Sequence, residues 1–236
     1  MSKESTFESV VDKLSSNQKR FVAEVIGTFI VVVLATGSVV IDAKLNSILD
    51  LPFIAFAPFV GVAIGVYLFG KISMAHFNPA VSVGFWITKH ITKKLLVLYL
   101  LAEIVGAILA SLFVSIIIGK ESNLGANIPN YSYPLSLIFG IEVLASSLLM
   151  AVILTAVYTK GLKRFGGIAI GGIVGLDIMF FAFISGASMN PARSLAPALL
   201  SGNLNDLWIY WTPTFVGTSL IALVLKKYFN PISENS

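Results

Sequence analysis

The sequence has 236 residues, of which 56% are hydrophobic and only 12% charged, and its formal net charge at pH 7 is +4. A soluble domain carries about 25% charged residues, so this composition excludes an ordinary globular domain and indicates a protein of the bilayer. The basic residues fall between apolar runs, so the positive charge does not point to a nucleic-acid partner. The absence of cysteine excludes disulfides and thiolate chemistry, and two histidines are too few for a histidine-rich metal site, so we expect no metal and no cofactor.

The first twenty residues are polar and lack the apolar core of a cleavable signal peptide. Within them Phe7, Val10, Val11 and Leu14 recur at the spacing of one helix face. We therefore expect residues 1–20 to form a cytoplasmic segment, either a short amphipathic helix on the membrane surface or a disordered tail.

Six apolar stretches are long enough to cross a bilayer as a helix, which needs roughly 20 residues. They cover residues 21–41, 51–69, 95–118, 134–158, 165–186 and 207–225. Two shorter apolar pieces, 79–88 and 191–200, would be roughly 15 Å long as helices, which reaches only halfway across. The sequence therefore predicts an all-α membrane protein with six transmembrane helices and two re-entrant half-helices.

The basic residues predict the orientation. With six spans, and with each short piece entering and leaving on one side, thirteen of them share one side of the membrane: Lys3, Lys13, Lys19, Arg20, Lys71, Lys89, Lys93, Lys94, Lys160, Lys163, Arg164, Lys226 and Lys227. Only Lys44, Lys120 and Arg193 lie on the other side. Because Lys and Arg concentrate in cytoplasmic loops, we expect both termini to be cytoplasmic.

The two halves of the chain resemble each other. The matching segments are Glu24-Val25-Ile26-Gly27-Thr28 with Glu142-Val143-Leu144-Ala145-Ser146, Asn78-Pro79-Ala80-Val81-Ser82 with Asn190-Pro191-Ala192-Arg193-Ser194, and Tyr99 and Gly106 with Tyr210 and Gly217. Three spans per repeat is an odd number, so the second copy is inserted upside down, an architecture that places the site near the midplane. We expect the first repeat at 21–122, the second at 123–228 and a cytoplasmic tail at 229–236. Gly27, Gly106 and Gly217 are expected where helices approach closely.

Each half contains one Asn-Pro-Ala triplet, Asn78-Pro79-Ala80 and Asn190-Pro191-Ala192, directly before its short apolar piece. Proline suits the first position of a helix, where its missing N–H has no partner to lose, and the asparagine before it can cap the helix. In lipid, irregular backbone at this depth occurs only where it is buried in protein or lines a watery cavity. Two such loops in inverted halves therefore predict a cavity through the membrane.

The two loops resemble the signature loops of the aquaporin (major intrinsic protein) family. The resemblance is carried by His76-Phe77-Asn78-Pro79-Ala80-Val81 and Met189-Asn190-Pro191-Ala192-Arg193-Ser194, and it extends from Ala23 to Gly217. It implies an aquaporin-like fold and a passive channel rather than an enzyme, in a cell membrane and usually assembled as a homotetramer. The sequence contains no Ser/His, paired-Asp or metal constellation that would favour an intramembrane enzyme.

The resemblance also implies roles for individual residues. The side-chain amides of Asn78 and Asn190 would donate hydrogen bonds to water in single file, and the positive ends of both half-helices would disfavour cations. Backbone carbonyls in the preceding loops would accept hydrogen bonds from the water; these loop residues are Ala75, His76, Phe77, Gly186 and Ser188. Glu24 and Glu142 would hold the loop backbones.

The position of the narrow filter, taken from the family spacing, falls on Pro58, Ile178, Ala187 and Arg193. Strict water channels of the family usually have Phe and His where this chain has Pro58 and Ile178, so we expect a wider and less polar aperture. That favours small uncharged solutes such as glycerol, urea, ammonia or undissociated weak acids. Other markers follow the water-channel pattern instead: Ser194 where glycerol facilitators have Asp, together with Ala198, Tyr210 and Trp211.

The expected function is a passive water channel that excludes protons and ions and passes some small uncharged solutes. A glycerol or small-solute facilitator on the same fold is the alternative, and an ion-coupled transporter with inverted repeats is a remote one. Asp177, beside Ile178, has two interpretations: a hydrogen bond to backbone or to a neighbouring helix, or a group that tunes Arg193 or the outer vestibule.

Overall fold

The computed structural model describes residues 14–159 and 161–228. The amphipathic segment expected at the N-terminus falls mostly outside this part of the chain, and the tail 229–236 lies wholly outside it. The first long helix, α2, spans Ser16–Lys44 and begins with a capping box formed by Ser15 and Gln18. Residues 16–20 therefore belong to the same helix as the first span.

Within the described residues, six helices are long and apolar enough to cross a membrane. They are α2, α3 (Asp50–Ser73), α5 (Lys93–Phe113, extended by a π-helical turn over Val114–Ile118), α7 (Leu135–Tyr158), α8 (Gly166–Ser185, preceded by a 3₁₀ turn over Lys163–Phe165) and α10 (Leu207–Leu225). All six stretches expected from the sequence are helical, and their ends move by a few residues.

The two half-helices are α4, over Pro79–Ile87, and α9, over Pro191–Ser201. Each has proline at its first position and an asparagine N-cap whose side chain accepts a hydrogen bond from the backbone. A short helical segment, α6 (Glu121–Gly125), lies in the connection between the halves.

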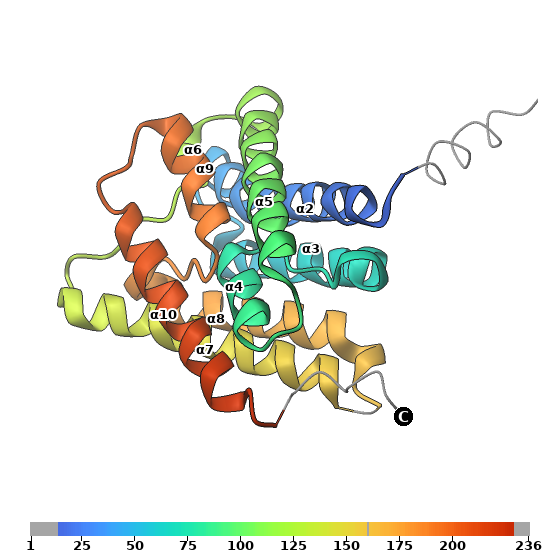
Figure 1. The fold of residues 1–236 in the computed structure, drawn as a ribbon. Helices are drawn as coiled ribbons and strands as arrows, with labels where there is room; N and C mark the ends of the chain where they lie inside the picture. The colour runs from blue at the N-terminus through green and yellow to red at the C-terminus, as the bar shows by residue number, and fades with distance from the viewer. Residues whose placement is uncertain (1–13, 160, 229–236) are drawn as a thin grey trace, which may run out of the picture.

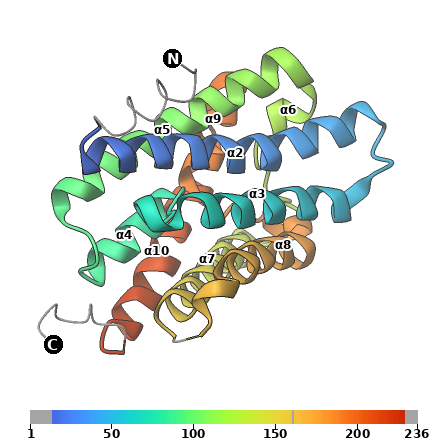
Figure 2. The same ribbon diagram turned by 90° about the vertical axis from the view of Figure 1, so that its right-hand side faces the viewer.

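The long helices surround the two half-helices (Figures 1 and 2). Helix α2 packs against α3 and α5, helix α7 packs against α8 and α10, and the contact between α3 and α8 joins the two groups. Each half-helix packs against a long helix of the other half: α4 of the first half contacts α10, and α9 of the second half contacts α5. This arrangement confirms the predicted fold class: an all-α membrane protein with inverted repeats and two re-entrant half-helices.

Glycines determine how closely two of these helix pairs approach. A Cβ atom added at Gly106 would lie 2.5 Å from the carbonyl oxygen of Val25, and one added at Gly217 would lie 2.3 Å from that of Val143. Gly27 differs, because an added Cβ there would lie 1.9 Å from the ring of Phe77. Gly27 therefore makes room for a loop side chain, whereas the other two bring helices together.

We expect Gly217→Ala to destabilise the protein, because the methyl group would force α10 away from α7. Overpacking of this kind costs about 1–3 kcal/mol. The measurement is the thermal unfolding midpoint of the purified protein in detergent. Gly140→Ala on α7 is the matched control, since no atom lies within 4 Å of an added Cβ there; equal midpoints for the two variants would contradict the prediction.

Candidate functional site

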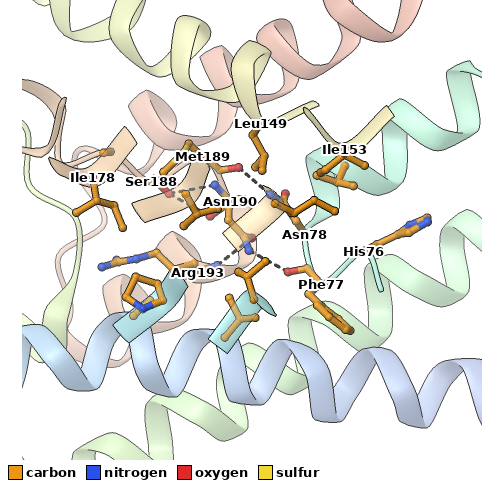
Figure 3. A pocket seen from close by; sticks show the side chains of 18 of the residues that line it. His76, Phe77, Asn78, Leu149, Ile153, Ile178, Ser188, Met189, Asn190 and Arg193 are labelled. Atoms are coloured by element: carbon orange, nitrogen blue, oxygen red, sulfur yellow. Dashed lines mark hydrogen bonds between the residues drawn. The ribbon is translucent and has the colours of Figure 1, made fainter. Parts of the chain in front are cut away.

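A narrow cavity of about 60 Å³ runs between the half-helices. In Figure 3, Ile178 and Arg193 lie at one end, His76 lies at the other, and Asn78 and Asn190 lie between them. A water molecule needs about 10–15 Å³ of such volume, so the cavity has room for roughly four. Most of the remaining lining is apolar, and includes Val31, Val62, Leu149, Ile153, Ile170 and Val174.

The loop before the first triplet is irregular and depends on a buried carboxylate. Ala75 and Phe77 have left-handed backbone conformations, with φ of 55° and 51°, which cost energy in a residue other than glycine. Glu24 of α2, which is fully buried, holds the loop: its two oxygens accept hydrogen bonds from the backbone N–H of His76 at 3.0 Å and of Phe77 at 2.7 Å.

The loop before the second triplet has the same design. Ala187 and Met189 are left-handed, with φ of 44° and 54°. Glu142 of α7 is also fully buried and accepts hydrogen bonds from the N–H of Ser188, at 3.1 and 3.2 Å, and of Met189, at 3.3 Å. In both loops the backbone N–H groups have no helical acceptor, and a buried carboxylate accepts their hydrogen bonds instead. These hydrogen bonds stabilise the strained conformations.

The two triplets are joined across the centre of the cavity. The side-chain amide of Asn78 donates to the carbonyl of Met189 at 2.8 Å, and that of Asn190 donates to the carbonyl of Phe77 at 2.9 Å (Figure 3). A side-chain amide has two N–H donors, so this brace leaves one on each asparagine for a molecule in the cavity. The prolines and alanines of the triplets are buried beneath the asparagines and do not line it.

A second hydrogen-bonded pair closes each loop onto its half-helix. His76 Nδ1 lies 2.7 Å from Ser82 Oγ, and the Ser82 hydroxyl donates to Glu103 of α5 at 2.6 Å. At the equivalent positions of the second half, Ser188 bonds to Ser194, whose hydroxyl lies 2.9 Å from the side-chain oxygen of Asn127.

The four residues expected to form the filter all line the narrow cavity: Pro58, Ile178, Ala187 and Arg193. A wider cavity of about 290 Å³ shares three of these residues, all but Pro58, and is lined also by Gly186. The two cavities therefore meet at these residues. Of the other expected loop residues, Ala75, His76, Phe77 and Ser188 line the narrow cavity. The carbonyl groups of Phe77 and Gly186 each accept a hydrogen bond from an asparagine side chain, which takes up part of their capacity to bind water.

Arg193 has one side-chain partner that the sequence did not suggest. Its Nη1 donates to the side-chain oxygen of Asn127 at 2.6 Å. The structure records no ion pair between Arg193 and a carboxylate among the residues that it describes, so its positive charge is not neutralised by a direct partner. Asn127 lies outside both triplets and outside every span. The one sequence signal for it is an amide side chain in the loop between the two repeats.

Asp177 lies buried on α8, next to Ile178 in sequence, and does not line either cavity. Its Oδ2 atom has no hydrogen-bond partner, and no hydrogen bond joins it to Arg193. At this oxygen the structure thus shows no hydrogen bond to backbone or to a neighbouring helix, and Asp177 does not bind Arg193 directly.

Six apolar helices around a narrow cavity with polar groups at its centre define a membrane channel. The chain belongs to the major intrinsic protein family, which matches residues 12–225. The family assignment confirms the resemblance seen in the sequence, and it makes the protein an integral membrane channel and not an enzyme.

Similar proteins include aquaporins of plants. Aquaporin TIP2-3 of Arabidopsis thaliana is 36% identical over 234 residues, which cover 94% of this chain and 92% of the relative. Aquaporin NIP1-1 of Zea mays is 34% identical over 201 residues, 84% of this chain and 71% of the relative. The X-ray structure of the aquaglyceroporin from Plasmodium falciparum has the same fold, with a TM-score of 0.75 and 22% identity over 89% of this chain and 96% of that one.

We expect Glu24→Gln to be far more damaging than Glu103→Gln. Both oxygens of Glu24 face backbone N–H groups, so an amide would point a donor at a donor and leave a buried N–H unsatisfied, at about 1–3 kcal/mol. Glu103 accepts a hydrogen bond from Ser82, and its Oε2 has no hydrogen-bond partner, so the amide nitrogen of Gln can take the place of that oxygen. Unfolding midpoints in detergent and the yield of monodisperse protein test this. Equal losses in the two variants would contradict it.

Proposed function

We propose that the protein is a passive channel that conducts water in single file, passes some small uncharged solutes, and excludes protons and ions. The observation that carries the proposal is the centre of the cavity, where Asn78 and Asn190 each keep one amide donor while the walls opposite, including Leu149 and Ile153, are apolar. Water there has few partners besides these two donors, which favours passage in file.

The exclusion of cations rests on two features. The N-termini of α4 and α9, where helix dipoles are positive, both lie at the centre of the cavity. Arg193 adds a positive charge at one end. A cation that entered would meet both and would lose hydration in a cavity with few oxygen ligands. Such electrostatic barriers are a general source of selectivity in channels of this type.

The four residues Pro58, Ile178, Ala187 and Arg193 are proposed to form the selectivity filter. Three of the four are apolar and Ala187 is small, so the aperture admits a solute with an apolar edge, and Arg193 can donate to its polar edge. This supports small uncharged solutes besides water, and the printed names of the relatives, aquaporins and an aquaglyceroporin, include both kinds of channel.

We further propose that the channel lies in a cell membrane with both termini in the cytoplasm, as the distribution of Lys and Arg favours, and that it forms homotetramers. The end that carries Arg193 then faces outwards.

An alternative is a dedicated facilitator for glycerol, urea, ammonia or undissociated weak acids, favoured by the apolar side chain of Ile178 in the filter. An ion-coupled transporter is disfavoured, because the carboxylates of Glu24 and Glu142 are already hydrogen-bonded to loop backbone and have little capacity left for a coupling ion.

Stopped-flow light scattering of proteoliposomes tests the function. We expect shrinkage in sucrose to be faster than in empty liposomes, and re-swelling in glycerol and urea also to be faster. Re-swelling no faster than in empty vesicles would leave a strict water channel, and slow shrinkage with fast re-swelling would favour the dedicated facilitator. Transport that requires a proton or Na⁺ gradient would overturn the proposal of a passive channel.

Mercury sensitivity provides a test of the filter position. The sequence has no cysteine, so mercuric chloride should not inhibit water flux in the unmodified protein. Ala187→Cys should make the flux sensitive to mercury and recoverable with a thiol, because a bound mercury atom would fill the aperture. Ser122→Cys is the control: Ser122 is exposed and lines only the wider cavity, so labelling there should leave water flux unchanged. Inhibition in the control alone would contradict the assignment.

A further inference from the structure

A groove of about 240 Å³ lies between α7 and α8, beside the connection that joins the two helices. Ala151 and Ala156 of α7 and Ala169 of α8 line it, and their small side chains leave it open. Leu162 and Phe165 line it from the connection, and both are exposed, so the groove opens on the surface of the protein. Because α7 ends seven residues after Ala151, the groove extends about 10 Å along the helix from the connection towards the membrane interior.

Two positive side chains lie at the end of the groove nearest the connection. Lys163 and Arg164 directly precede the lining residue Phe165, in one 3₁₀ turn. The guanidinium carbon of Arg164 lies 4.7 Å from the centre of the Phe165 ring, a favourable cation–π distance. The hydroxyl of Tyr67 on α3 donates to the carbonyl of Arg164 at 3.1 Å, which ties the turn to a neighbouring helix. Among the described residues the structure records no ion pair for Lys163 or Arg164, so their charges are available to a partner.

The charged residues on this side of the membrane are of one sign. The start of α2, the end of α3 and the α7–α8 connection all lie towards the right of Figure 1. The other basic residues at these helix ends, at the α4–α5 turn and at the end of α10 are Lys19, Arg20, Lys71, Lys89, Lys93, Lys94, Lys226 and Lys227. Of the acidic residues in the described part of the chain, Glu24, Glu103, Glu142 and Asp177 are buried within long helices, and Asp42, Asp50, Glu121 and Asp206 lie at the opposite helix ends. No described carboxylate is therefore available to the cations of this side.

The shape and the charge of the groove together determine what can occupy it. Within the span the groove faces the bilayer, where an apolar groove is filled by an acyl chain or by another protein surface. A second copy of this chain would bring further basic residues to the same level of the membrane, which adds repulsion. A lipid with a phosphate in its head group brings a negative charge to Lys163 and Arg164 and an apolar chain to the groove. Basic pockets at the cytoplasmic ends of membrane helices are a general kind of site for anionic head groups.

We propose that the groove between α7 and α8 binds an anionic phospholipid, with the phosphate on Lys163 and Arg164 and one acyl chain along Ala151, Ala156 and Ala169. The site does not depend on which solutes the channel passes, because none of these residues lines the narrow cavity. Such a lipid joins the ends of α7 and α8 on the side that we propose to be cytoplasmic. Because it binds the folded helix pair, it also stabilises the protein.

The first experiment measures lipid retention by native mass spectrometry of the full-length protein, incubated with phosphatidylglycerol and phosphatidylcholine that have the same acyl chains. Combining Lys163→Gln with Arg164→Gln should lower the ratio of retained phosphatidylglycerol to phosphatidylcholine by about tenfold to thirtyfold, because two cations beside the phosphate are lost. Lys93→Gln combined with Lys94→Gln is the matched control. It removes two exposed charges from the same side, at the start of α5, and neither residue lines the groove, so the ratio should stay within about threefold.

The second experiment fills the groove. Ala169 is exposed and lines the groove, whereas its neighbour Ile168 is exposed and does not line it. Ala169→Trp should weaken phosphatidylglycerol binding at least about threefold, because the acyl chain loses its van der Waals contacts, and Ile168→Trp should leave the binding unchanged. Glycerol phosphate has the head group without an acyl chain and should not displace the lipid. The charge variants and Ala169→Trp act independently, so either decides if the other fails to fold.

Four results would overturn the proposal: equal retention of the two lipids by the unmodified protein, an equal fall of the ratio in the control with Lys93 and Lys94 changed, unchanged binding in Ala169→Trp, or displacement of the lipid by glycerol phosphate. Retention by single chains but not by the assembled oligomer would also overturn it, and would show that a second copy of the chain covers the groove instead.

Discussion

The structure depends on satisfying irregular backbone in the middle of a membrane. Two loops turn their N–H groups away from any helix at a depth where, in a bilayer, no lipid atom can accept a hydrogen bond. Glu24 and Glu142 supply the acceptors, and each carboxylate is positioned by a long helix of its own half. Burying an acid costs energy, but leaving several N–H groups unsatisfied would cost more than one kcal/mol for each. The half-helices, the central asparagines and the narrow cavity all follow from this arrangement.

The cross-brace between the triplets makes the two halves depend on each other. Asn78 caps α4 and donates to the loop before α9, while Asn190 caps α9 and donates to the loop before α4. Neither half can therefore form its own site alone, because each loop needs an amide from the other. The two halves also match farther from the centre. The Tyr99 hydroxyl donates to the backbone carbonyl of Ser73, the last residue of α3, and the Tyr210 hydroxyl donates to that of Ser185, the last residue of α8; both distances are 2.7 Å.

The sequence predicted most of the fold because its elements leave local signals. Runs of apolar residues locate the six spans, and the proline of each Asn-Pro pair is the first residue of the half-helix that follows it, α4 or α9. Contacts that depend on tertiary packing left no such signal. The ring of Phe77 occupies the space left by Gly27, and Asn127 reaches Arg193 across 66 residues of chain. Neither of these contacts follows from periodicity or composition. The start of α2 at Ser16 is a different case, because its Ser15–Gln18 capping box is a local signal that a search for apolar runs does not detect.

The centre of the cavity and the proposed filter are built from different parts of the chain. We call the hydrogen bonds that join the two triplets at the centre the central brace. The centre is built by the two triplets and two buried acids, which bind one another through backbone groups and tolerate little change. The residues at the Arg193 end come from α3, α8, the loop before α9 and, through Asn127, the loop between α6 and α7. Substitutions there alter the size and polarity of the aperture without touching a hydrogen bond of the central brace. The selection of solutes can therefore vary while the positive helix ends at the centre stay in place.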